Sequence, residues 1–278
     1  MKKTRPFLPY VFVASGVVFL LGLWAIVAAI LKSQGNMVIL YPHESFARVF
    51  EFLFLDGAAK TWTAIGWTTL RFVIGFVISF VLGSLLGSLA GLHQWFKHFM
   101  KPTLGVMKTI PTAAVVILIV ATIYGPKNAH LITYVPCLLI FIVAFPLIFE
   151  AFRTALENEN PSVLASLDLD GGRRSWMALT KVLWPDAFAY ARLSIAQSLG
   201  LSMKVCIMSE VLSATSASKP SVGGLISNAQ SSGAVEDILP LALIALLLML
   251  IIDIPFFIVR SKITFQFTPY IHLHHRRS

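Results

Sequence analysis

Charged side chains within long apolar stretches are the residues of this chain best placed to do chemistry. Lys204 and Glu210 fall in one such stretch, and Asp253 falls in the next. If these stretches cross a membrane, each charge is costly and is usually paired or faces water. A lysine that lines a water-filled path would favour an anionic or zwitterionic solute. The three residues are therefore candidates for a translocation path.

The sequence suggests no pairing among these charges. Lys204 and Glu210 are six positions apart, which places them on different faces of a helix. In the topology argued below, Asp253 lies about 10 Å nearer the cytoplasm than Lys204 at the rise of a helix. For Lys204, a structural pair and snorkelling to the membrane surface remain alternatives to lining a path.

Other chemistry finds little support in the sequence. No Gly-x-x-x-x-Gly-Lys-Ser/Thr pattern occurs and no soluble domain could contain one, so we expect ATP and Mg²⁺ only in a partner subunit. We expect no catalytic residue, no metal site and no cofactor in this chain. The remaining histidines and cysteines are interpreted as a solvated tail (His272, His274 and His275) and as packing residues (Cys137 and Cys206).

The elements that must position these residues are membrane spans. Of the 278 residues, 57% are hydrophobic and 13% are charged, against about a quarter charged in soluble domains. A helix needs about 20 apolar residues to cross a bilayer. The chain is predicted to be an all-α polytopic membrane protein, one transmembrane domain over 1–278, with spans near 8–31, 68–92, 103–124, 131–152, 189–213 and 238–260.

Basic residues indicate how the spans are oriented, because Lys and Arg collect on the cytoplasmic side. Six spans place both termini on one side. If that side is inside, the inner segments hold fourteen Lys and Arg (2, 3, 5, 97, 101, 153, 173, 174, 181, 192, 260, 262, 276 and 277) and the outer ones hold five (32, 48, 60, 127 and 219). We therefore expect a multi-pass cell-membrane protein with cytoplasmic termini. The net charge of +9 then reflects the bilayer and not nucleic acid.

Two segments on the outer side carry further predictions. Helical spacing of apolar residues predicts a short interfacial helix over 45–55, with an extension of the second span as the alternative. The small and polar segment 214–235 is predicted to be a mobile loop or a short re-entrant piece that gates an outer mouth.

Small residues recur at every fourth position of the second span. Such a ridge lets another helix approach closely, because no large side chain separates the backbones. The sequence does not indicate whether the partner helix belongs to the same subunit. The ridge consists of Gly75, Ser79, Gly83, Gly87 and Gly91.

One long polar interruption, 154–188, lies on the predicted cytoplasmic side. It resembles the loop of binding-protein-dependent ABC permeases, which reads Glu-Ala-Ala, three residues, Gly, nine residues, Ile-x-Leu-Pro. Gly172 and Pro185 match this spacing and Val182 replaces the Ile, whereas Ser166 stands where the family has its Glu. The resemblance extends from about residue 60 to the end and is closest to the nitrate, sulfonate and taurine group. Its other motifs lie at 69–76, 101–111, 209–210 and 253–260.

This resemblance implies the membrane subunit of a type I ABC importer, with its core permease region at about 60–262. It implies a coupling helix near 161–172 that docks in a cytoplasmic ATPase, an external solute-binding protein and a second copy of the chain. The expected coupling residues are Leu164, Ser166, Asp168, Gly172, Arg173, Val182 and Pro185.

Two alternatives remain at this point. An ion-coupled secondary transporter would show inverted repeats and midplane acids, and a membrane-embedded enzyme would need a convergent nucleophile and base. Sulfonates, taurine, nitrate and thiamine precursors are all open as solutes.

Overall fold

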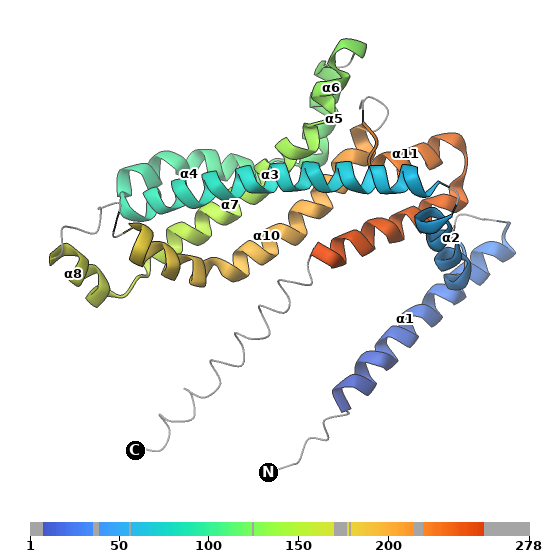
Figure 1. Ribbon diagram of the computed structural model, residues 1–278, viewed down its shortest axis with the longest axis horizontal. Coiled ribbons are helices and arrows are strands. Elements are labelled where there is room, and N and C mark those ends of the chain that lie inside the picture. The colour runs from blue at the N-terminus through green and yellow to red at the C-terminus, as the bar shows by residue number, and fades with distance from the viewer. Residues whose placement is uncertain are drawn as a thin grey trace.

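The computed structural model describes residues 8–35, 39–55, 57–123, 125–169, 177, 179–213 and 219–252. Every regular element in these ranges is a helix, so the predicted all-α class is confirmed. Three long helices, α3, α7 and α10, run along an elongated body (Figure 1). The helix α8 lies at one end of this body, and α2 and α11 lie at the other. These are named below the α8 end and the α11 end.

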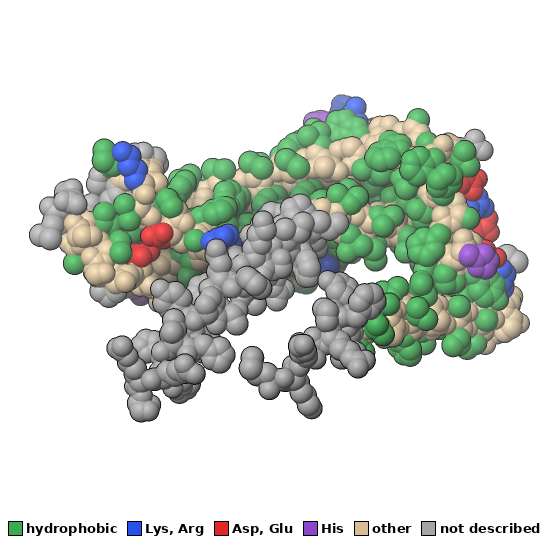
Figure 2. Space-filling model, turned by 60° about the horizontal axis from the view of Figure 1, so that its bottom comes forward, with side chains coloured by type: hydrophobic (Ala, Val, Ile, Leu, Met, Phe, Trp, Pro, Cys, Tyr) green, Lys and Arg blue, Asp and Glu red, His purple; other side chains and the backbone are tan. Residues whose placement is uncertain are grey.

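The helices long and apolar enough to cross a membrane correspond to the predicted spans. Five qualify singly, and a sharply bent pair makes a sixth if it is counted as one span. Apolar side chains spread over much of the surface, as expected of a lipid-facing protein (Figure 2). The five single helices are Val11–Ser33 within α1 (Leu8–Ser33), α3 (Ala58–Leu92), His130–Glu157 with α7 (Val135–Glu157), Thr180–Ser213 with α10 (Trp184–Ser213), and Val235–Ile252.

The predicted third span, 103–124, is wrong as a single helix. The chain instead forms α4 (Gln94–Thr109) and α5 (Thr112–Ile123), whose axes differ by 89°. Pro111 lies at the break, and Ile110 before it adopts an extended backbone with φ −64° and ψ 125°. A residue that precedes proline disfavours helical backbone, which accounts for the position of the break. Beyond it, α5 and the short α6 (Ala129–Ile132) pack against α7 and α10 through the buried Val116 and Ile132, and they project to one side of the body (Figure 1).

The small-residue ridge of α3 lies against α7 of the same chain. A Cβ added at Gly87 would lie 2.5 Å from the carbonyl oxygen of Phe149, and one at Gly91 would lie 2.8 Å from Cβ of Leu156. Gly75 and Gly83 approach α7 almost as closely, with added Cβ atoms 3.0 Å from its atoms. The two backbones are thus in direct contact over most of the length of α7.

Helix α10 packs along α7 and completes the core. Its buried face includes Ile195, Leu199 and Met203. At the α8 end, the π-helical turn η2 (Leu179–Leu183) leads into α10, and Trp184 Nε1 donates a hydrogen bond to Ser88 Oγ at 2.9 Å. This contact joins the start of α10 to α3.

The α11 end is closed by short helices. The predicted interfacial helix is α2 (Pro42–Phe54), and the alternative of a longer second span is wrong because Gly57, at φ 87°, separates α2 from α3. The segment predicted as a loop or re-entrant piece contains a helix, α11 (Val222–Ser232). Helix α1 touches this end through Trp24, whose Nε1 donates to the carbonyl of Leu40 at 3.0 Å.

Candidate functional site: a buried ion pair and an exposed helix

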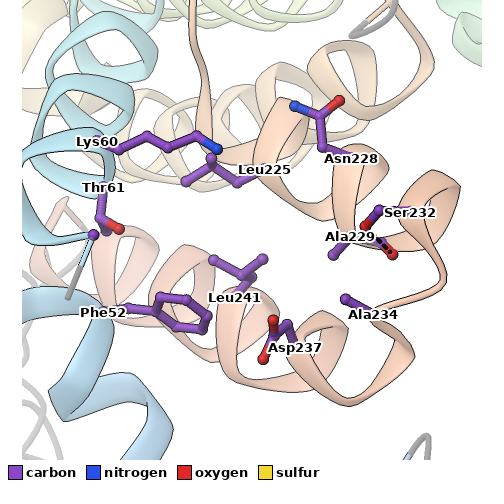
Figure 3. A pocket seen from close by; sticks show the side chains of 11 residues that line it. Phe52, Lys60, Thr61, Leu225, Asn228, Ala229, Ser232, Ala234, Asp237 and Leu241 are labelled. Atoms are coloured by element: carbon purple, nitrogen blue, oxygen red, sulfur yellow. Dashed lines mark hydrogen bonds between the residues drawn. The ribbon is translucent and has the colours of Figure 1, made fainter.

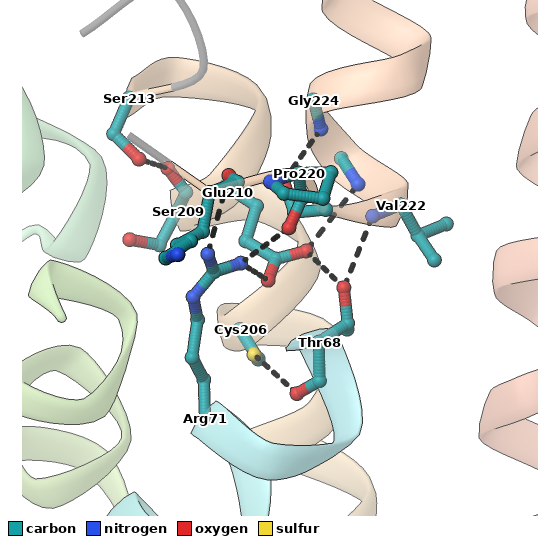
Figure 4. A network of polar contacts seen from close by, with 12 residues as sticks. Thr68, Arg71, Cys206, Ser209, Glu210, Ser213, Pro220, Val222 and Gly224 are labelled. Carbon is teal, nitrogen blue, oxygen red and sulfur yellow. Dashed lines mark hydrogen bonds and ion pairs between the residues drawn. The ribbon is translucent and has the colours of Figure 1, made fainter. Parts of the chain in front are cut away.

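A buried ion pair joins α3 to α10 at the α11 end. Arg71 Nη1 lies 2.8 Å from Glu210 Oε1, and the side chains are 2% and 1% exposed (Figure 4). Among the charges considered from the sequence, Glu210 had only Lys204 and Asp253 as candidate partners, so Arg71 was not identified. Ionised groups removed from water need both a partner and further hydrogen bonds to offset their desolvation. The surrounding residues supply those bonds.

The carboxylate of Glu210 receives hydrogen bonds from three directions. Thr68 Oγ1 donates to Oε2 at 2.8 Å, and the backbone N–H of Gly223 donates to the same oxygen at 3.3 Å. Thr68 Oγ1 also accepts a bond from the N–H of Val222 at 3.0 Å. The carboxylate therefore lies at the N-terminus of α11, where the helix dipole favours a negative charge.

The guanidinium of Arg71 fixes the segment that leads into α11. Its Nη1 and Nη2 donate to the carbonyls of Pro220 and Lys219, each at 3.3 Å. Ser221 then caps the helix by accepting from the N–H of Gly224 at 2.9 Å. One ion pair thus anchors α11 to both α3 and α10. We call Thr68, Arg71, Glu210 and the segment 219–224 the outer network.

Gly223 allows α11 to approach α10 this closely. A Cβ added there would lie 2.6 Å from Cβ of Glu210 and 2.7 Å from the carbonyl oxygen of Ile207. Any larger residue would push the helix away from the carboxylate that its N–H contacts. The glycine is therefore part of the outer network as much as the charges are.

A cavity of about 490 Å³ adjoins α11 beyond the network (Figure 3). Its walls come from α2, the start of α3, α11 and the last helix, Val235–Ile252. Its polar lining includes Lys60, Asn228 and Asp237. Hydrogen bonds therefore fix the N-terminus of α11, and one side of the rest of the helix faces the cavity.

The exposed helix α8 (Pro161–Leu169) lies at the opposite end of the body (Figure 1). Asn160 begins it, because its Oδ1 accepts from the N–H of Ser162 at 3.1 Å. Ser166 is exposed. Its hydroxyl donates a hydrogen bond to the carbonyl of Val163 at 2.8 Å, and within the described residues it has no other partner. Leu167 packs against the core. The helix thus exposes Ser162, Ala165 and Ser166, while Leu167 ties it to the body.

The other predicted coupling residues are placed as follows. Leu164 and Asp168 lie within α8, and Gly172 and Arg173 lie outside the described residues. Val182 is half-buried in the π-helical turn, and Pro185 is exposed in the first turn of α10.

The predicted path residues separate in the structure. Glu210 belongs to the outer network, and Asp253 lies outside the described residues. Lys204 is exposed on α10, on a face that it shares with Gln197 two turns away, and it forms no ion pair with any described residue. A lysine without an ion-pair partner is costly in contact with lipid. We therefore expect the face of α10 that carries Lys204 and Gln197 to contact water or another subunit.

Several helices are long and apolar enough to cross a membrane, and they pack tightly against one another. The protein is therefore a polytopic membrane protein. A family model described as "Binding-protein-dependent transport system inner membrane component" matches residues 79–264. The match covers more than half of the chain, including α8, α10 and α11, so the chain belongs to this family and is an ABC transporter permease component. Among curated proteins, none matches the chain.

Proposed function

We propose that this chain is the membrane subunit of an ATP-driven importer that receives its solute from an external binding protein. The observation that carries the proposal is α8, an exposed helix at one end of the spans and inside the matched region. The chain would bind no nucleotide itself, and ATP with Mg²⁺ would act in a separate ATPase.

The proposed orientation places the α8 end in the cytoplasm. Lys97, Lys101 and Arg153 lie near this end, at the start of α4 and the end of α7. The excess of Lys and Arg on the inner segments supports that orientation, with both termini cytoplasmic. The α11 end then faces the binding protein.

Helix α8 would act as the lever between the ATPase and the spans. In this proposal the exposed side around Ser166 enters a groove of the ATPase, with Leu164, Asp168, Gly172 and Arg173 in the same joint. Val182 and Pro185 at the foot of α10 would receive the movement. Because α10 packs closely on α7 and carries Glu210, its displacement would reach the outer network.

At the outer end, the network would hold α11 as a gate. Rotation of α10 against α3 would separate Glu210 from Arg71 and release the first turn of α11. The cavity behind α11 offers the helix room to move. This proposal gives the segment 219–232 the gating role that its composition suggested.

The solute path would run along the exposed face of α10 that carries Lys204. A second copy of the chain would cover this face, so that Lys204 meets water instead of lipid. A cation at this depth favours an anionic or zwitterionic solute. Sulfonates and nitrate are anionic and taurine is zwitterionic, so these solutes fit a cation, and the nitrate, sulfonate and taurine group remains the proposed relationship. Thiamine precursors are the other solute class proposed, without this match in charge.

Energy dependence of uptake separates this proposal from an ion-coupled transporter. In cells that express the chain with its partner ATPase and binding protein, we expect uptake to stop on ATP depletion and to survive an uncoupler while ATP is maintained. Uptake that survives ATP depletion but stops on collapse of the ion gradient would support the ion-coupled alternative instead.

A further inference from the structure

One aromatic ring beside the outer network contacts two of its cations. The centroid of the Trp67 ring, on α3, lies 5.8 Å from Arg71 Cζ and 5.2 Å from Lys219 Nζ. Trp67 is half-buried one turn before Arg71, which is buried, whereas Lys219 is exposed. A cation within about 6 Å of the centre of a tryptophan ring is attracted to its face. Trp67 therefore connects an exposed charge to the buried ion pair.

The two cations differ in their counter-charges. Glu210 pairs with Arg71 at 2.8 Å, so the buried cation is neutralised. Lys219 forms no ion pair with any described residue, and its side chain is exposed. Charged groups in protein interfaces are commonly matched by an opposite charge on the partner. An acidic side chain is therefore the group that Lys219 is suited to meet from the outer side.

The backbone of Lys219 is also tied to Arg71. Arg71 Nη2 donates to the carbonyl of Lys219 at 3.3 Å, and Nη1 donates to that of Pro220 at the same distance. Arg71 Nε is buried and has no hydrogen-bond partner among the described residues. The position of the guanidinium therefore depends on Glu210, these two carbonyls and the Trp67 ring. A displacement of Lys219 would remove one of these hydrogen bonds and one of the two cations on the ring.

We propose that Lys219 is a docking contact for an acidic side chain of the external partner, and that Trp67 transmits this contact to the buried ion pair. A close charge pair inside a protein interface is stronger than an exposed contact between a cation and a ring. A docked carboxylate would thus draw the ammonium off Trp67, and the Lys219 carbonyl would leave Arg71. The first turn of α11 would then be loosened from outside. This step rests on the proposed function, which supplies the partner and the gate.

Hydrogen exchange of the purified chain in a neutral detergent tests the link through the ring without any partner. The readout is exchange of the amides in 219–232, where two backbone N–H groups donate into the network. Lys219→Gln should speed this exchange by about two- to fivefold, the range expected for one exposed contact between a cation and a ring. Lys60→Gln is the matched control, because Lys60 is also exposed at this end but contacts no aromatic ring among the described residues. It should exchange like the wild type.

A double-mutant cycle shows whether Lys219 acts through Trp67. Trp67→Leu removes the ring from both cations and should speed the exchange at least as much as Lys219→Gln. The double variant Trp67→Leu/Lys219→Gln should then exchange like Trp67→Leu alone, because the contact is already lost. Trp67→Phe and Lys219→Arg, which keep a ring and a cation, should stay close to the wild type. Effects of the two single variants that multiply would overturn transmission through the ring.

A carboxylate-rich probe tests the docking contact. Acetyl-hexaglutamate, compared with a neutral Gly-Ser peptide at matched ionic strength, should speed exchange at 219–232 in the wild type and not in Lys219→Gln. An unchanged wild type, or an equal response of the variant, would overturn the docking role. A response to nanodiscs of dioleoyl phosphatidylglycerol instead of the peptide would assign Lys219 to a lipid headgroup and overturn the protein partner. Uptake is measured in none of these experiments, so failure here leaves the proposed function standing.

Discussion

The buried pair at the α11 end and the ion pairs at the α8 end hold their charges in different ways. At the α11 end, Arg71 and Glu210 are sealed from solvent, and neighbouring polar groups supply further hydrogen bonds. At the α8 end, the ion pairs of Lys97, Lys108 and Arg153 are between about one-fifth and one-half exposed, and α8 exposes Ser166. A sealed charge fixes the geometry of its own chain, whereas an open charge is available to a partner.

This difference is consistent with the proposed division of labour. The α11 end must keep a defined closed state until the spans move, and a buried pair provides one because separating it is costly. In this proposal the α8 end accepts a subunit from outside. Its ion pairs are accordingly more exposed than the Arg71–Glu210 pair.

The largest expected loss of stability comes from removing one partner of the buried ion pair, so that the other charge is buried without a partner. Arg71→Leu strands Glu210 and should destabilise the protein by about 3–5 kcal/mol. Lys108→Leu at the exposed pair should cost less than about 1 kcal/mol. Unfolding of both purified variants in the same detergent measures the contrast. Equal losses would contradict the distinction between the two ends.

The double variant Arg71→Leu/Glu210→Leu sharpens the same comparison. It removes both charges, so it should be less destabilised than the sum of the single variants, as is common for buried pairs. Unfolding of the four proteins of this double-mutant cycle gives the coupling free energy. Strict additivity would mean that the two side chains do not interact in the folded protein.

The next largest effect on stability is expected at the contact between α3 and α7, the two helices that run from one end of the core to the other. Gly87→Ala should overpack the α3–α7 interface and cost about 1–3 kcal/mol. Gly66→Ala on the same helix is the matched control, because a Cβ there meets nothing within 4 Å. It should be neutral or slightly stabilising, since alanine favours helix over glycine. A comparable loss in both variants would argue against direct backbone contact.

A smaller effect is expected at Lys204, and on transport instead of stability. Lys204→Gln should lower uptake of an anionic solute by about tenfold, or about 1.4 kcal/mol, while the melting temperature stays close to that of the wild type. Lys127→Gln is the matched control, because Lys127 is also exposed but lies outside the proposed path. Unchanged uptake by the Lys204 variant would remove this residue from the path.

The smallest effect concerns the contact between α1 and α2. Lys32 Nζ donates to Glu44 Oε1 at 2.9 Å, and this bond, with a second from the N–H of Tyr41, lowers the pKa of Glu44. A lowered pKa stabilises the fold above the ordinary pKa of about 4.3, and this contribution disappears as the pH falls through the lowered value. The small difference in melting temperature between wild type and Lys32→Gln should therefore vanish in acid. A difference that grows below pH 4 would contradict the assignment.

Much of the architecture could be predicted because apolar length is sufficient to locate a span. The ridge from Gly75 to Gly91 also predicted a close helix contact, which the structure shows to involve α7. Pro111 in the sequence favours an interruption of the helix, but a proline does not specify an angle, and the 89° bend depends on what α5 packs against. The short α11 was hidden because its small and polar residues have little apolar periodicity.

The buried ion pair could not be predicted, because Arg71 and Glu210 are 139 positions apart. Their pairing depends on the register of α3 against α10, which no local pattern contains. One signal was present: Arg71 lies four residues before Gly75 and so extends the buried ridge of α3. A buried arginine needs an acidic partner, which here comes from α10 and not from α7, the helix that packs on the ridge.

The central claim is that α8 receives a cytoplasmic ATPase, and a pull-down with matched serine variants tests it most directly. Ser166 on α8 and Ser231 on α11 are both exposed, and each hydroxyl bonds back to its own helix, at 2.8 Å in both cases. Membranes that contain the chain and a candidate partner ATPase would be solubilised, and the ATPase retained by the tagged chain would be quantified. We predict that Ser166→Arg loses most of the bound ATPase and that Ser231→Arg retains it. Full retention by the Ser166 variant, or equal loss in both, would contradict the account.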